Sequence, residues 1–79
     1  MPTRMVQLIF PQALIKEPVV YTMAMQCHVI PNIRRAKVTE TSGEVTLELE
    51  GPEDALKKAV VFLEKKGVKV ESVVGDVVS

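Results

Sequence analysis

Residues 33–50 read IRRAKVTETSGEVTLELE, and this stretch predicts a β-hairpin in the middle of the chain. Two alternating runs, 33–41 and 44–50, flank Ser42-Gly43, where glycine can supply the positive φ that a tight turn needs. A turn centred on these two residues places Thr41 opposite Glu44 and so sets every pair behind it. The predicted pairs are Lys37 with Glu48, Arg35 with Glu50 and Thr39 with Thr46 on one side of the sheet, and Val38 with Leu47 and Ala36 with Leu49 on the other.

A strand and a helix are predicted before the hairpin. Residues 4–10 alternate with a period of two, which is typical of a strand, and Pro11 ends the run. From residue 19 to about residue 28 apolar side chains recur at helical spacing, with Pro18 in the first turn. Pro31 cannot continue the helix, so the chain becomes extended there.

A helix and a strand are predicted after the hairpin. The second helix starts at Gly51-Pro52 and is capped by Gly67, and the last strand runs from 68 to about 74. We expect residues 75–79 to extend this strand or to fray. The side chains expected to face the core from the two helices are Val20, Met23, Ala24 and Cys27, followed by Ala55, Leu56, Ala59, Phe62 and Leu63.

The resulting order β-α-β-β-α-β predicts an α+β, ferredoxin-like fold, in which two helices cover one face of a four-stranded antiparallel sheet. With 79 residues the whole chain, 1–79, is expected to form a single domain. Its hydrophobic content is 47% with one tyrosine and two phenylalanines, so the core must be mainly aliphatic. Because so small a core stabilises little, a homo-oligomer, most simply a dimer, is expected to bury more apolar surface.

Composition excludes several classes of function. Ten basic and ten acidic residues cancel, which argues against a nucleic-acid partner held by charge. The chain has a single cysteine, too few for a disulfide or an iron–sulfur cluster, and it has no apolar run of the ~20 residues that span a bilayer. With no signal-peptide core at its N-terminus either, we expect a cytoplasmic protein without a membrane span.

No arrangement of residues predicts catalysis, and no cofactor or metal is expected. The chain has no carboxylate pair, Ser/His/Asp set or phosphate-binding glycine loop, and Cys27-His28 alone supplies too few ligands for zinc. We expect Cys27 to pack as a small apolar side chain. The third predicted strand carries no aromatic residues, which excludes an RNA-recognition motif.

Two groups of residues remain as candidate sites. Asn32 lies at the mouth of a strand, where its amide can donate and accept; the alternative is a turn residue that bonds its own backbone. Arg34 is predicted on the inward side of that strand, level with Ala36, so that it either lines a ligand mouth or reaches out to solvent. Tyr21, Met25 and His28 form a second stripe on the first helix, which is either a partner surface or a set of scattered surface side chains.

Several short motifs, in this order, resemble the NIL domain family. Asn32-Ile33 with the following Ala36 and Val38 resembles the family's signature segment, in which Arg34 replaces an aliphatic residue. The other matching segments are VQLIF at 6–10, EPVV at 17–20, ELEG at 48–51 with the apolar pairs at 55–56 and 62–63, and GVKVE at 67–71.

This resemblance implies a module that binds methionine, usually as a dimer. NIL domains occur at the C-terminal end of the ATPase of bacterial methionine importers and beside ferredoxin-type domains. By resemblance, Asn32 would contact the ligand, while Ile33 and nearby apolar residues would take the thioether at a dimer interface. A transporter ATPase or a ferredoxin-type protein would then be the partner that receives the signal.

Two hypotheses therefore stand. In the first, the chain is a sensor that binds methionine or a related amino acid near Asn32, Ile33 and Arg34. In the second, it is a protein-interaction module without a ligand, which docks through Tyr21, Met25 and His28 or through a sheet edge. Amino-acid sensors of the ACT type share the predicted order but usually carry a glycine-bearing loop after the first strand, and residues 11–18 contain no glycine.

Overall fold

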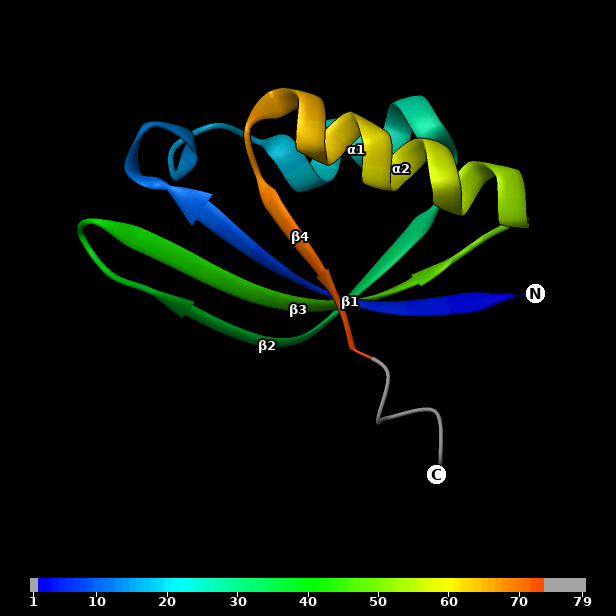
Figure 1. The fold of residues 1–79 in the computed structure, drawn as a ribbon, viewed down its shortest axis with the longest axis horizontal. Helices are drawn as coiled ribbons and strands as arrows, with labels where there is room; N and C mark the ends of the chain where they lie inside the picture. Colours follow the sequence, from blue (N-terminus) through cyan, green and yellow to red (C-terminus); the bar gives the residue numbers. More distant parts are fainter. Residues whose placement is uncertain (1, 74–79) are drawn as a thin grey trace.

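A computed structural model describes residues 2–73 of the chain and confirms the predicted order β-α-β-β-α-β. Four antiparallel strands form one sheet in the order β2-β3-β1-β4, and the two helices lie together on one face of it (Figure 1). The elements are β1 Thr3–Pro11, the short 3-10 helix η1 Gln12–Leu14, α1 Val19–Cys27, β2 Ile30–Val38, β3 Ser42–Glu50, α2 Glu53–Lys66 and β4 Lys69–Ser72. The predicted tail, 75–79, lies outside the described residues.

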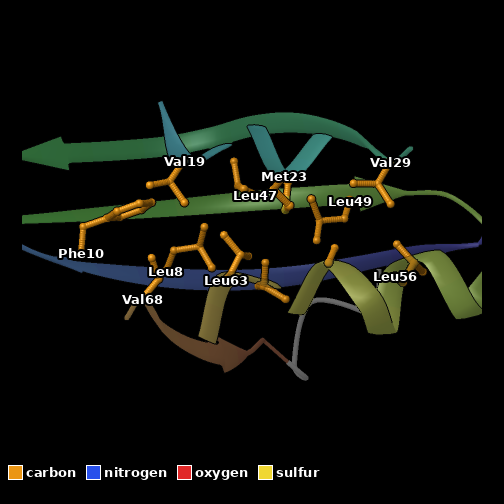
Figure 2. Packing of buried hydrophobic residues seen from close by; sticks show 12 residues of the cluster. Leu8, Phe10, Val19, Met23, Val29, Leu47, Leu49, Leu56, Leu63 and Val68 are labelled. Carbon is orange, nitrogen blue, oxygen red and sulfur yellow. The ribbon is translucent and has the colours of Figure 1, made fainter. Parts of the chain in front are cut away.

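The core lies between the sheet and the helices, and it is almost entirely aliphatic. Leu8 and Leu47 from the two central strands meet Met23 of α1 and Leu63 of α2, and all four side chains are fully buried (Figure 2). Burying such a side chain contributes about 1.5–3 kcal/mol relative to exposure. The predicted stripe of α2 is confirmed in its centre, because Leu56, Ala59 and Leu63 are buried while Ala55 and Phe62 are half-buried.

Cys27 is half-buried against this core, as are Val20 and Ala24. The thiol therefore packs as an apolar group beside the core, in agreement with its expected role.

Both helices end in a left-handed residue. After α2, Gly67 has φ 105°, and the Val68 N–H donates to the Leu63 carbonyl at 3.0 Å, which closes the last turn as predicted. After α1, His28 takes the same conformation with φ 58° and ψ 46°, although it carries a Cβ that disfavours it. The helix was predicted to end at about residue 28, and His28 is its C-terminal cap; the next strand begins at Ile30.

The predicted register of the hairpin was wrong. Lys37 pairs with Glu44 instead of Glu48, and Arg35 with Thr46 instead of Glu50, a displacement of four residues along β3. The Thr39 N–H donates to the Ser42 carbonyl at 2.8 Å, and the Thr39 hydroxyl also accepts the N–H groups of Thr41 at 3.3 Å and Ser42 at 3.1 Å, so backbone and side chain close the turn together. A polar loop over residues 39–41 therefore replaces the predicted glycine turn, and Gly43 is a strand residue opposite Val38.

A displacement by an even number of residues leaves each side chain on its predicted face, so Arg35 and Lys37 still face away from the helices. The alternation of side chains between the two faces is interrupted at Arg34, because the pairing with β3 shifts by one residue between Ile33 and Arg35. Arg34 was predicted to lie inward beside Ala36, and this prediction was wrong: its guanidinium contacts Glu48, on the face of the sheet that the helices leave uncovered.

Candidate functional site

The candidate ligand residues lie on β2, which is an edge strand of the sheet. All of its side chains are exposed except Pro31, and the exposed fractions are 64% for Ile33 and 61% for Val38. A nine-residue edge with exposed β-branched side chains is unusual, because the free N–H and C=O groups can pair with another strand. Pro31, which cannot donate a backbone hydrogen bond, is confined to such edges.

Asn32 and Arg34 share one face of the strand, and Ile33 points to the other. Asn32 lies opposite Glu48, whose carboxylate Oε1 is 3.6 Å from Nη1 of Arg34. Ile33 lies opposite Leu47 on the helix side. An amide, a guanidinium and a carboxylate therefore gather on the uncovered face, while the apolar side chain lies behind them.

The outer edge of β2 borders both faces of the sheet. A ligand lying along this edge could contact Asn32 or Arg34 on one side and Ile33 on the other, and it could also use the free backbone groups of the strand. The bulge at Arg34 locally redirects the side chains, and such irregularities are frequent beside binding sites.

The second candidate group lies on α1, and its members are exposed as the sequence predicted. The exposed fraction is 67% for Tyr21 and 59% for Met25, while His28 is the left-handed cap residue at the end of the helix. The opposite side of α1 carries the buried Val19 and Met23. Tyr21 and Met25 thus lie on the side of α1 away from the core, whereas His28 lies beyond the end of the helix and does not continue their helical spacing.

A pocket of about 210 Å³ lies where α1 begins, at the far end of β2. Its deepest lining residues include the buried Phe10 and Val19, and the exposed side chains of Glu17, Tyr21 and Val38 stand at its rim. Sequence reasoning missed this pocket, because its lining comes from segments that only the fold brings together. Asn32 is six residues from Val38, which corresponds to about 20 Å along a strand, so the pocket is separate from the Asn32 site.

Charged groups throughout residues 2–73 remain at the surface, and no polar or charged side chain there is buried. Within the same part of the chain, no group of three or more His, Cys, Asp or Glu side chains is placed to hold a metal ion. Neither helix of the described chain is long and apolar enough to cross a membrane.

Comparison with known proteins gives matches of two kinds, to a family profile and to solved structures. The sequence profile of the NIL domain matches residues 4–72, which is most of the chain. Among solved structures, the C-terminal domain of an ABC transporter ATP-binding protein from Enterococcus faecalis is similar, with a TM-score of 0.79 and 21% sequence identity. The similarity covers 90% of this chain and 83% of that one, and at this identity it shows the shared fold. No curated protein sequence matches the chain.

Proposed function

Because this chain belongs to the NIL domain family, we propose that it is a regulatory domain that binds L-methionine or a related amino acid at the interface of a homodimer. The observation that carries the proposal is the exposed edge strand β2, with Asn32, Ile33 and Arg34 around its bulge. The domain would act in the cytoplasm without catalysing a reaction. Its output partner would be a transporter ATPase, as the fold shared with the Enterococcus faecalis domain suggests, or a ferredoxin-type protein.

The dimer would form by antiparallel pairing of β2 with β2 of a second copy. Such pairing satisfies the free backbone groups of the edge and continues one sheet through both copies. It also covers Ile33 and Val38, which are exposed in the single chain. Since α1 lies on the β2 side of the sheet, the Tyr21 and Met25 surfaces of the two copies would approach each other above the joined strands.

The ligand would lie at this edge with its charged groups towards Asn32 and Arg34. The Arg34 guanidinium and the Asn32 amide N–H₂ group donate to the carboxylate, and Glu48 with the Asn32 amide oxygen accepts from the ammonium group. The unbranched thioether tail of methionine would pack against Ile33, and the second copy would exclude water from it. The exposed pair Arg34–Glu48 contributes little to folding, so it is free to reorganise around a ligand.

An amide-shift titration with L-methionine tests the ligand. We expect saturable shifts around residues 30–35 and 48, and none with L-alanine, which lacks the thioether. Shifts confined to the pocket rim at Glu17, Tyr21 and Val38 would place the ligand there instead and refute the edge site. Absence of shifts at millimolar ligand would leave the second hypothesis, in which the domain binds only protein.

Two charge insertions test the dimer. Ile33→Lys places a charge on the paired edge, and Met25→Lys places one on the exposed surface of α1. With β2 pairing as the main contact, sedimentation should show that Ile33→Lys dissociates the dimer more completely than Met25→Lys. The reverse order would make α1 the interface, and an unchanged mass in both variants would exclude both surfaces.

A further inference from the structure

A second cavity, a shallow groove of about 400 Å³, lies between α1 and α2 on their outer side. Figure 1 shows the two helices side by side over the sheet, and the groove lies beside the C-terminal end of α1, where Gln26 and Cys27 line it. Its apolar lining consists of the half-buried Cys27 and Phe62 together with Val61, which is 48% exposed. Val61 stands opposite the buried stripe of α2, at a position where a solvated helix would carry a polar side chain.

The charged residues that line this groove are all lysines: Lys57, Lys58 and Lys65. Within residues 2–73, none of the three is within ion-pair distance of a carboxylate. Glu53 and Asp54 lie one turn before Lys57 and Lys58, but Glu53 is instead 3.9 Å from Arg4. The groove is therefore a local concentration of positive charge on a chain whose formal net charge is zero.

The spacing of these residues along α2 defines what the groove can hold. Lys58 and Lys65 are seven residues apart, or about 10 Å along the helix axis, and Val61 and Phe62 lie between them. The ammonium group of Lys66 lies 5.8 Å from the centre of the Phe62 ring, so a further cation borders the apolar lining. A matching ligand would carry two negative charges about 10 Å apart and an apolar group between them.

We propose that the α1–α2 groove is a docking site for an acidic segment of a partner protein, in which carboxylates flank one apolar side chain. Charge complementarity with three unpaired lysines selects an acidic partner, and the apolar lining receives the side chain between its carboxylates. Lysines lie on both sides of the apolar lining along α2, so a single chain segment with carboxylates on both sides of an apolar side chain can contact all of it. It is distinct from the β2 edge, so ligand binding there and docking here can be measured separately.

The test uses a short synthetic peptide, blocked at both ends, in which glutamates flank a single leucine, titrated into the labelled protein. Amide shifts are expected at residues 26–27 and 57–65, and affinity should fall as salt rises from about 50 to about 300 mM, because salt screens exposed charges. Replacing the glutamates by glutamine, or the leucine by serine, should weaken binding of the peptide.

Two protein variants with the same charge change separate the groove from general electrostatics. Lys58→Glu should weaken peptide binding at least about fivefold, whereas Lys69→Glu, on the uncovered sheet face, should change it by less than about twofold. Val61→Ser tests the apolar contact and should weaken binding without altering the charge. Equal losses in Lys58→Glu and Lys69→Glu would overturn the proposal, as would peptide shifts outside the groove. Binding to phosphatidylserine vesicles without binding to the peptide would overturn it in favour of a membrane surface.

Discussion

The most informative perturbation is Asn32→Ala, because its expected effects on folding and on binding differ widely. Asn32 is exposed, and no side-chain hydrogen bond to it is formed within residues 2–73, so its removal should change the free energy of unfolding by less than about 0.5 kcal/mol. In the proposed complex the Asn32 amide forms hydrogen bonds with charged groups of the ligand, and such a hydrogen bond contributes about 1.5–3 kcal/mol. Its loss should therefore raise the Kd for L-methionine by about 10- to 150-fold.

Titration calorimetry measures the Kd, and urea unfolding measures the stability of the same samples. Gln12→Ala is the matched control, since Gln12 is also an exposed amide but lies in η1 after the far end of β1. The affinity of the Gln12→Ala variant for L-methionine should equal that of the unmodified chain. An Asn32→Ala variant that is folded and binds methionine with unchanged affinity would remove Asn32 from the site and refute the reasoning. A large loss of stability would show that Asn32 has a structural role in the strand.

Four further variants test the fold and the proposed ligand site. Leu63→Ala removes a fully buried side chain and should lower the free energy of unfolding by about 2–5 kcal/mol in urea; a loss below about 1 kcal/mol would contradict the packing of α2. His28→Gly removes the steric cost of a side chain in the left-handed conformation and should raise the free energy of unfolding by about 1 kcal/mol. A lower Tm would show that the imidazole makes a compensating contact. Thr39→Ala removes the hydroxyl that accepts two turn N–H groups and should cost about 1–2 kcal/mol; unchanged thermal unfolding would show that the hydroxyl does not stabilise the turn. Glu48→Gln should cost less than about 1 kcal/mol of stability yet weaken methionine binding, and equal binding would exclude the carboxylate from the ligand site.

The two functional hypotheses differ in what the exposed β2 edge is for. A sensor uses the edge to bring two copies together around a ligand, whereas an interaction module offers it, or α1, to a different protein. Exposure of Ile33, Val38, Tyr21 and Met25 fits either use, because each surface is apolar and uncovered in the single chain. The arrangement of Asn32, Arg34 and Glu48 favours the sensor, since a zwitterionic amino acid needs donors and acceptors within a few ångströms of each other.

The order of elements, and the face on which most side chains lie, followed from the sequence by itself; Arg34 is the exception. A period of two in residues 4–10 and helical spacing in residues 53–66 are local patterns, and core side chains that the helical spacing indicates, such as Leu56 and Leu63, are buried as expected. Cap signals are local too, which is why Gly67 was identified as the end of α2. The motifs that resemble the NIL family, which lie between residues 6 and 71, could likewise be identified without a structure.

Tertiary structure alone decided the register of β2 and the surroundings of the candidate site. A pattern with a period of two looks the same after a slip of four residues, so it determined the face of Lys37 but left its partner, Glu44, undetermined. The extra residue at Arg34 then interrupted the alternation of faces along β2. As a result the Arg34 guanidinium lies beside Glu48 on the uncovered face and not in the core. The groove between α1 and α2 joins Cys27 to lysines some thirty positions later, and only the packing of two helices on one sheet makes them neighbours. Periodicity depends on each residue and its near neighbours, whereas register and grooves depend on which distant segments can bury the same apolar surface together.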